Sequence, residues 1–206
     1  MKIALIGASG RAGSRIAAEL SARGHSVTGI ARDAARVAAL PGVTPVAADV
    51  ADTTALAALL AGHDAVVSSV PFTASDPDGL IGAVKASKVP RYLVVGGAGS
   101  LEVAPGKLLV DSPDFPSAYK AEAAAGLAFL NRLREERELD WTFLSPSAEF
   151  EPGERTGRFH LGRDELLVGP DGSRISFEDF AVALSDEIED PRHSRQRFTV
   201  GYSACP

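Results

Sequence analysis

The chain has 206 residues, of which 45% are hydrophobic and 23% charged, with a formal net charge of −6. These values are ordinary for a globular protein, and the length favours a single domain over residues 1–206. The mildly acidic balance excludes the clustered basic face that DNA or RNA binding requires, so we expect no nucleic-acid partner.

Short apolar runs rich in Val and Ile alternate along the chain with longer Ala/Leu segments at helical spacing. This alternation is typical of βαβ units and predicts an α/β fold, a Rossmann-type doubly wound parallel sheet. The predicted strands span residues 2–6, 26–30, 44–47, 65–68, 92–95 and 141–144. The predicted helices between them span residues 13–23, 33–40, 53–60, 77–87 and 117–138.

Several helix ends carry sequence signals. Thr53 precedes an Ala/Leu run as a predicted N-cap, and Gly62 follows the run as a left-handed stop. From residue 149 onward the sequence is rich in turns, and we expect a small C-terminal elaboration on the substrate side. It should contain strands near 158–161 and 196–200 and a helix over 177–189 capped by Ser176. The carboxylates of Glu149 and Glu151, which precede a Pro-Gly turn, are predicted to lie in a solvated loop.

The strongest motif is a three-glycine turn directly after the first predicted strand. A dinucleotide diphosphate needs close backbone approach and free amides at a helix N-terminus, and glycine permits both. Gly7 should make the turn, Gly10 should lie against the phosphates, and Gly13 should let the helix pack on the strand. The predicted diphosphate site consists of Gly7, Ser9, Gly10, Arg11, Ala12 and Gly13.

The end of the second predicted strand bears on the choice of cofactor. NAD sites usually place a carboxylate there, whereas NADP sites place an arginine that pairs with the 2′-phosphate. Here Ala31 is followed by Arg32, so NADP is favoured and NAD is the alternative. Two interpretations of Asp33 stay open, a cap on the next helix or a ribose contact, and Arg32 could also be a simple solvated charge.

Motifs along most of the chain resemble one protein family. They are Gly7-Ala8-Ser9-Gly10-Arg11-Ala12-Gly13, Ala48-Asp49-Val50, Ser68-Ser69-Val70-Pro71, 94–101, 139–146, 153–157 and 197–200. Together they resemble the atypical short-chain dehydrogenase/reductase proteins, and among these the NADH-flavin reductase group, with relatives in biliverdin reductase B and the NmrA-like NADP-binding regulators.

The resemblance implies further cofactor contacts. Asp49 and Val50 would flank the adenine, Ser69 and Val70 would line the cofactor, and residues 96–100, with Gly96 and Gly97 as cofactor contacts, would face its nicotinamide half. These positions follow predicted strands, and ligands of open α/β sheets lie across the carboxyl ends of the strands. A helix cap is the alternative interpretation of Asp49.

The catalytic candidates are Ser100, Tyr119 and Lys120. Typical short-chain dehydrogenases use Ser together with Tyr-x-x-x-Lys, in which the lysine lowers the tyrosine pKa. Here Ala123 stands four residues after Tyr119, and Lys120 points about 100° away from Tyr119 on a helix. The alternative interpretations are structural: Ser100 caps a turn, Tyr119 packs at the start of the helix, and Lys120 is solvated.

These observations favour an NAD(P)H-dependent reductase that passes hydride to a planar small-molecule acceptor, such as a flavin or quinone. A ring acceptor requires stacking more than a strong protein acid. The first alternative is a regulator that senses NADP(H) without turnover. The second is a sugar-nucleotide epimerase or dehydratase, which would need the intact Tyr and Lys pair.

The remaining signals concern location and metals. The N-terminal apolar run is too short for a secretion signal, and no stretch approaches the roughly 20 apolar residues of a membrane span. The one cysteine, Cys205, has no partner for an internal disulfide, which fits a reducing compartment. We therefore expect a cytoplasmic protein with no membrane partner, either a monomer or a dimer. The four histidines lack metal-ligand spacing, so no metal site is predicted.

Overall fold

An eight-stranded sheet forms the centre of the computed structural model, which describes residues 1–202; Cys205 lies outside the described residues. The strand order is β10-β12-β8-β5-β4-β1-β2-β3, and every pair is parallel except β10 with β12. The bounds are β1 (Lys2–Ile6), β2 (Ser26–Ala31), β3 (Val43–Ala47), β4 (Ala65–Ser68), β5 (Arg91–Val95), β8 (Asp140–Ser145), β10 (His160–Gly162) and β12 (Gln196–Gly201).

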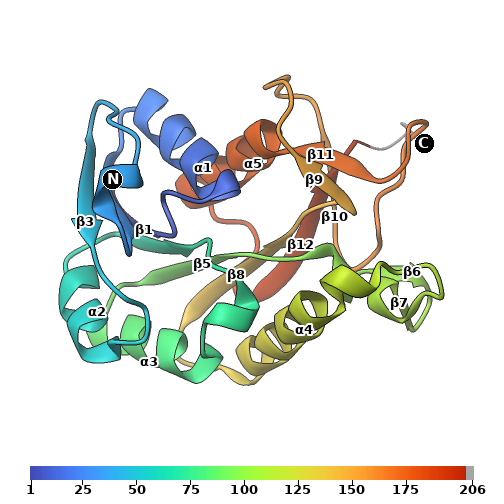
Figure 1. Ribbon diagram of the computed structural model, residues 1–206, viewed down its shortest axis with the longest axis horizontal. Coiled ribbons are helices and arrows are strands. Elements are labelled where there is room, and N and C mark those ends of the chain that lie inside the picture. The colour runs from blue at the N-terminus through green and yellow to red at the C-terminus, as the bar shows by residue number, and fades with distance from the viewer. Residues whose placement is uncertain (203–206) are drawn as a thin grey trace.

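The chain winds outward from β1 in both directions, which confirms the predicted Rossmann-type doubly wound sheet. Helices α1 (Arg11–Ala22) and α5 (Phe177–Glu189) cover one face. Helices α2 (Thr53–Leu60), α3 (Pro77–Ser87) and α4 (Lys120–Glu135) cover the other (Figure 1). The order reverses between β1 and β4, and the crevice at such a reversal is where open α/β sheets bind ligands.

The core is divided into two parts by the sheet. Successive side chains of a strand point to opposite faces. Accordingly Ile3 and Leu5 of β1 belong to the cluster beneath α1 and α5, while Ala4 and Ile6 belong to the cluster beneath α2, α3 and α4. All four side chains are almost fully buried, so β1 is anchored from both sides at the point where the glycine turn begins.

The C-terminal segment contributes more to the main sheet than the sequence suggested. Both β10 and β12 extend that sheet, and α5 packs beside α1. The prediction of a solvated loop at Glu149 and Glu151 is wrong, because these residues form β9 (Glu149–Glu151), paired with β11 (Arg174–Ser176). Between the two exposed carboxylates, the ring of Phe150 packs 4.5 Å from Phe177 and 4.7 Å from Phe180, measured between ring centroids.

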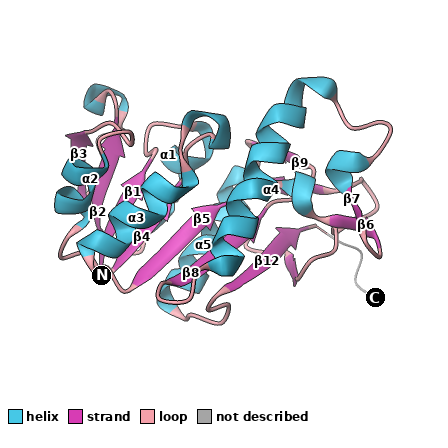
Figure 2. Ribbon diagram, turned by 90° about the horizontal axis from the view of Figure 1, so that it is seen from below, coloured by secondary structure: helices cyan, strands magenta, loops and turns pink. Residues whose placement is uncertain are grey.

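A short hairpin, β6 (Glu102–Ala104) with β7 (Lys107–Leu108), is the other small sheet. Figure 2 shows β6, β7 and β9 grouped near α4 at one end of the molecule. This end carries the segments that surround the larger cavity described below.

The predicted helix over residues 33–40 is wrong. Only a 3-10 turn, Ala34–Arg36, forms there, because Val37 adopts an extended conformation with ψ of 129° and buries its side chain in the core. Gly29 of β2 makes room for that side chain, since a Cβ at Gly29 would lie 2.9 Å from Val37 Cγ1. Tertiary packing therefore overrides the local helical pattern.

Two other helix boundaries differ in detail. The segment predicted as one helix over residues 117–138 is a 3-10 turn, Ser117–Tyr119, followed by α4, which ends at Glu135. The N-cap of α2 is Asp52, whose carboxylate accepts the amide hydrogen of Ala55 at 3.0 Å, and Thr53 is already helical. Ser176 caps α5 as predicted. Among the described residues 1–202, no helix is long and apolar enough to cross a membrane.

Candidate functional site

The turn between β1 and α1 is built so tightly that two of its positions must be glycine. Gly7 has a φ of +86°, and a Cβ there would lie 2.1 Å from the carbonyl oxygen of Ser69. A Cβ at Gly13 would lie 2.1 Å from the carbonyl oxygen of Gly7. The predicted roles of Gly7 in the turn and of Gly13 in helix packing thus have a steric basis.

The N-terminus of α1 faces an open groove. Gly10 is the N-cap in an extended conformation, and its amide donates to the Gly7 carbonyl oxygen at 3.0 Å. Helix geometry leaves the amides of the first turn without carbonyl partners, and the helix dipole makes this end positive. The first turn of α1 carries no acidic residue, so these amides fit an anionic diphosphate.

A groove of about 440 Å³ lies in front of this turn. Three successive parallel strands end there, since the residues after β1, β4 and β5 all contribute to it. The groove is lined by Gly10, Arg11, Ala12, Ser69, Val70, Pro71, Phe72, Val95, Gly96, Glu122, Phe150 and Phe177. The topology therefore brings Gly10, Arg11 and Ala12 of the predicted diphosphate site together with Ser69, Val70 and Gly96, whereas Gly7, Ser9 and Gly13 do not line the groove.

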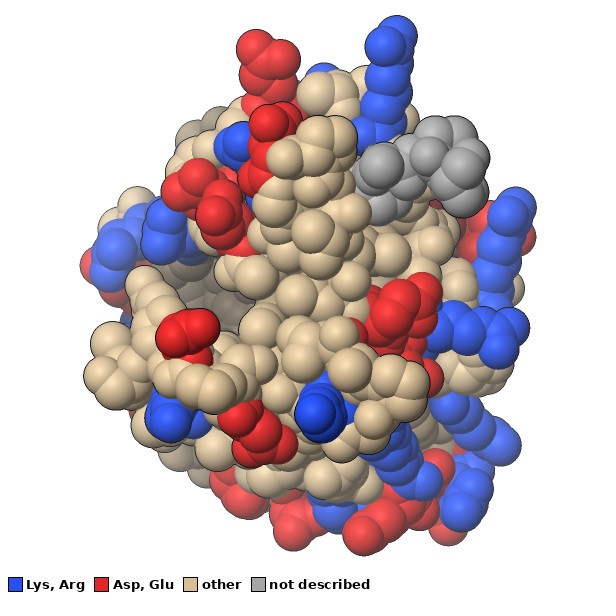
Figure 3. Space-filling model, turned by 90° about the vertical axis from the view of Figure 1, so that its right-hand side faces the viewer, with Lys and Arg blue, Asp and Glu red and all other residues tan. Residues whose placement is uncertain are grey.

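A second cavity of about 750 Å³ adjoins the groove. The two share Arg11, Phe72, Gly96, Glu122 and Phe150 on their walls, so they form one continuous depression. The further lining residues of the cavity are Gly97, Ala98, Gly99, Ser100, Leu109, Ser112, Asp114, Phe115, Pro116, Tyr119, Ala123, Gly126, Leu127, Ala148, Glu149 and Glu151. Figure 3 shows a hollow on this side of the molecule with carboxylates above and below it.

Phe72 occupies the wall between groove and cavity and is held there by Glu122, a residue that the sequence analysis missed. The Glu122 carboxylate accepts the amide hydrogens of Phe72 at 2.6 Å and Thr73 at 3.0 Å, and the Thr73 hydroxyl at 2.7 Å. Gly126, one helical turn further along α4, leaves space for the Phe72 ring 3.0 Å from where a Cβ would stand. A loop-to-helix contact of this kind leaves no local sequence signal.

The three catalytic candidates lie in different environments. Ser100 is 5% exposed and Tyr119 is 65% exposed, and both line the cavity. Lys120 is exposed and is not among the residues that line it. Ala123, four residues after Tyr119, packs its Cβ against Gly99. The structure thus brings Ser100 and Tyr119 to one cavity, and none of the residues that line this cavity is a lysine.

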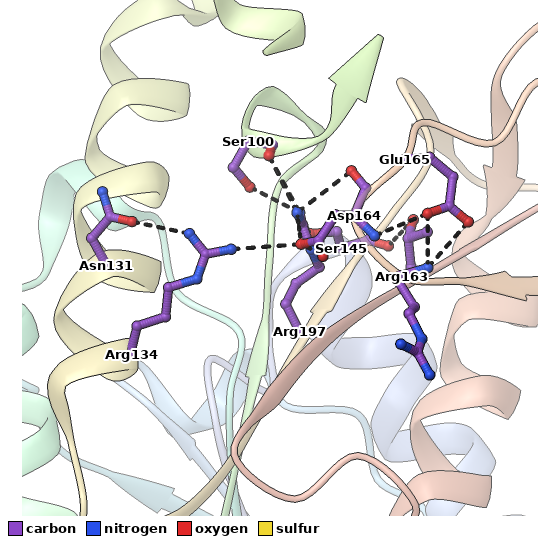
Figure 4. Close-up of polar contacts among 9 residues, drawn as sticks. Ser100, Asn131, Arg134, Ser145, Arg163, Asp164, Glu165 and Arg197 are labelled. Carbon is purple, nitrogen blue, oxygen red and sulfur yellow. Dashed lines mark hydrogen bonds and ion pairs between the residues drawn. The ribbon is translucent and has the colours of Figure 1, made fainter. Parts of the chain in front are cut away.

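Arg197 of β12 reaches Ser100 through the protein interior. Its side chain is only 3% exposed and forms an ion pair with Asp164. Its Nη1 donates to both the carbonyl and the hydroxyl oxygen of Ser100 at 3.4 Å, and to Ser145 Oγ at 3.5 Å (Figure 4). Arg134 of α4 approaches the same Asp164 carboxylate at 3.5 Å. A buried cation therefore supports the back of the cavity wall.

The remaining predicted cofactor residues lie outside both cavities. Arg32 is exposed at the end of β2 and has no ion-pair partner among residues 1–202. Asp33 caps the following 3-10 turn by accepting the Ala35 amide hydrogen at 3.1 Å. Asp49 accepts the Ala51 amide hydrogen at 3.0 Å, so its interpretation as the helix cap is wrong. Val50 packs against the core beneath α2.

Metal binding finds no support in the part of the chain that the structure describes. No three His, Cys, Asp or Glu side chains within it are grouped closely enough to hold a metal ion.

The sequence itself matches a family that binds the kind of ligand this groove fits. A family model described as NAD(P)H-binding matches residues 7–191, from the glycine turn to the residues after α5. The chain belongs to the NAD(P)H-binding family. Its fold is that of an NAD(P)H-binding, oxidoreductase-like protein.

Three solved structures of similar proteins agree with this family. One, from Burkholderia pseudomallei and provisionally named an exported protein, is 46% identical with a TM-score of 0.88, covering 98% of this chain and 100% of that one. A second, from Bacteroides thetaiotaomicron and provisionally named an epimerase, is 40% identical with a TM-score of 0.93, covering 100% and 98%. A third, from Streptococcus pneumoniae TIGR4 and provisionally named an NADH-flavin reductase, is 34% identical with a TM-score of 0.83, covering 98% and 100%. The predicted resemblance to the NADH-flavin reductase group is confirmed.

Proposed function

We propose that this member of the NAD(P)H-binding family is an NADPH-dependent reductase that passes hydride to a planar acceptor such as a flavin or quinone. The observation that carries the proposal is the cavity of about 750 Å³, lined by aromatic rings, that opens directly into the cofactor groove. Its volume lies within the roughly 300–1,000 Å³ typical of small-molecule sites. The shared wall at Phe72 and Gly96 would bring cofactor and acceptor into contact.

The residues of the groove suit a dinucleotide. The amides at the start of α1 would hold its diphosphate, and Gly7 and Gly10 would permit close backbone approach. Ser69, Val70, Gly96 and Gly97 would line the half nearer the cavity. When bound, the nicotinamide ring supplies the hydride.

The residues of the cavity would orient a ring. Phe72, Phe150 and Tyr119 offer aromatic faces for stacking and help exclude water. The Ser100 hydroxyl oxygen accepts a hydrogen bond from the Arg197 cation, which leaves its own proton available for a carbonyl oxygen of the acceptor. Hydride addition to a conjugated ring places negative charge on such an oxygen, where this donor would stabilise it.

The missing lysine favours a ring acceptor over an alcohol or a sugar nucleotide. No lysine lines the cavity with Tyr119, so the paired groups that exchange a proton in chemistry at a saturated carbon are not assembled there. The Bacteroides relative is provisionally named an epimerase, and this chain lacks the Tyr-x-x-x-Lys pair that such chemistry would use. The same absence makes a sensor that binds NADP(H) without turnover the second candidate.

NADP is the proposed cofactor because Arg32 is exposed at the end of β2 and has no ion-pair partner among residues 1–202. A free guanidinium can take the 2′-phosphate in a two-pronged contact. The roles of Asp49 and Val50 near the adenine stay part of the proposal. We also propose a cytoplasmic location and a small-molecule partner, with neither nucleic acid nor membrane bound, on the basis of composition and charge.

The deciding experiment is titration with NADPH and NADH, followed by turnover with a flavin and a quinone. Oxidation of NADPH that depends on the acceptor and on the protein supports the reductase. Tight NADPH binding with no turnover of any acceptor refutes it and supports the sensor. A Ser100→Ala variant should lower turnover while leaving NADPH affinity unchanged.

A further inference from the structure

The walls of the acceptor cavity carry an excess of negative charge. Four acidic residues line it, Asp114, Glu122, Glu149 and Glu151, against a single basic residue, Arg11. None of the four forms an ion pair within residues 1–202, and Glu122 is bonded only to neutral groups. The lining therefore has a net of three negative charges when these carboxylates are ionised.

The one basic residue that lines the cavity, Arg11, also lines the cofactor groove, so it does not offset the negative charge that an acceptor meets. Arg11 is the first residue of α1 and its guanidinium stands 5.1 Å from the ring centroid of Phe177. In the cofactor groove, a bound diphosphate would form an ion pair with this guanidinium. With cofactor in place, the acceptor faces carboxylates alone.

The basic side chains nearest to the rim do not change this balance. Lys120 follows Tyr119 but does not line the cavity. Arg174 pairs in register with Glu149, and it borders, with Glu149 and Glu151, a smaller depression of about 210 Å³ but does not line the cavity. Neither cation has an ion-pair partner among the four cavity carboxylates within the described residues.

The carboxylates are also arranged along the direction an acceptor must take. A ring that receives hydride has to lie beside Gly96, which lines both the cavity and the groove. Any tail on that ring has to extend away from the groove. Asp114, Glu149 and Glu151 all line the cavity and are exposed to solvent, and none of them lines the groove.

We propose that the cavity selects planar acceptors without a phosphate group, and so takes the dephosphorylated flavin in preference to its nucleotide form. This selectivity rests on the proposed reductase function and assigns its substrate class. The charge that repels a phosphate is supplied by Asp114, Glu149 and Glu151, while the aromatic walls are indifferent to it. A neutral quinone satisfies the same requirement.

Riboflavin and flavin mononucleotide test this directly, because they share one ring system and differ by a phosphate. We expect kcat/KM with NADPH to be about tenfold or more higher for riboflavin at about 10 mM salt, since the repulsion acts over several ångströms with little screening. At about 500 mM salt the ratio should approach one, because the Debye length falls well below the size of the cavity.

Charge variants locate the effect. The double variant Glu149→Gln/Glu151→Gln should reduce the ratio at low salt several-fold. Glu135→Gln is the matched control, because Glu135 is an exposed carboxylate at the last position of α4, about 20 Å along the helix from Glu122. It should leave the ratio unchanged. Equal use of the two flavins, or a ratio that neither salt nor the double variant changes, overturns the proposal.

A binding measurement separates this inference from the reductase function. Quenching of flavin fluorescence by protein saturated with NADP⁺ gives the two dissociation constants without turnover. If riboflavin binds more tightly than the nucleotide form but neither flavin nor a quinone is reduced, the charge selection stands and the reductase function falls. If both are reduced and bind equally, the reductase stands and the charge selection falls. If neither flavin binds, the charge selection is overturned.

Discussion

Gly13 offers the sharpest test of the turn, because a single methyl group there would meet only backbone atoms. The Cβ of a Gly13→Ala variant would lie 2.1 Å from the carbonyl oxygen of Gly7, 2.9 Å from its carbonyl carbon and 3.3 Å from Ala8 Cα. None of these atoms can rotate away. Relief requires α1 to move away from β1 by more than about 1 Å, judged against a normal contact of about 3.5 Å.

That movement has a calculable cost. It would loosen Ile16, Ala17 and Leu20, which α1 buries in the core. Overpacking costs about 1–3 kcal/mol, and an unyielding backbone places Gly13→Ala at the upper end. The better helix propensity of alanine offsets about 1 kcal/mol of this destabilisation. We therefore expect Gly13→Ala to lower the free energy of unfolding by about 2 kcal/mol.

Gly82 in α3 provides a matched control. It is exposed, it lies within a helix as Gly13 does, and a Cβ there would have no atom within 4 Å. Gly82→Ala should therefore stabilise the protein by about 0.5–1 kcal/mol. The two chemically identical substitutions should thus differ by about 3 kcal/mol.

Urea unfolding followed by the fluorescence of the buried Trp141, the one tryptophan of the chain, measures both variants. NADPH titration provides a second readout, because a shifted α1 displaces the amides that would hold the diphosphate, so Gly13→Ala should also bind NADPH more weakly. A Gly13→Ala protein that is as stable as Gly82→Ala, and that binds NADPH as the unchanged protein does, would refute the steric reasoning.

Three further predictions concern single side chains. Arg32→Ala should weaken NADPH binding about tenfold, the worth of one charge-assisted contact, with little effect on NADH; equal losses in parallel titrations would contradict the role given to Arg32. Arg197→Lys should lower kcat for acceptor reduction about tenfold at unchanged NADPH affinity, because a lysine cannot contact Ser100 and the Asp164 carboxylate at once; an unaltered kcat would remove Arg197 from the site. Glu19→Gln should lower the free energy of unfolding by about 1–2 kcal/mol at neutral pH, since a hydrogen bond from Arg155 lowers the pKa of the Glu19 carboxyl. The stability contributed by ionised Glu19 is complete above its usual pKa of 4.5 and is lost as the pH falls through the folded-state pKa. Thermal melts of the two proteins should therefore converge in acid.

The glycine turn was predictable from the sequence because all of its determinants are local. An apolar strand, three glycines and a helix follow one another within about one βα unit, and the steric demand at Gly7 and Gly13 comes mainly from that unit and the neighbouring strand. Strands β1 and β4 and helices α2 and α3 likewise have the bounds that their patterns predicted, since each is encoded by a run of neighbouring residues.

The acceptor side depended on the tertiary structure. Ser100 and Arg197 are 97 positions apart, and Glu122 and Phe72 are 50 apart, so only the folding of β12 and α4 against the sheet brings each pair together. The helix predicted after Asp33 does not form, because Val37 is buried in an extended conformation instead. The segment at Glu149 is a strand and not the predicted loop, because Phe150 packs against two aromatic rings. Local chemistry thus specifies where a dinucleotide can approach the backbone, whereas the shape and charge of the neighbouring cavity arise from contacts between segments that the sequence keeps far apart.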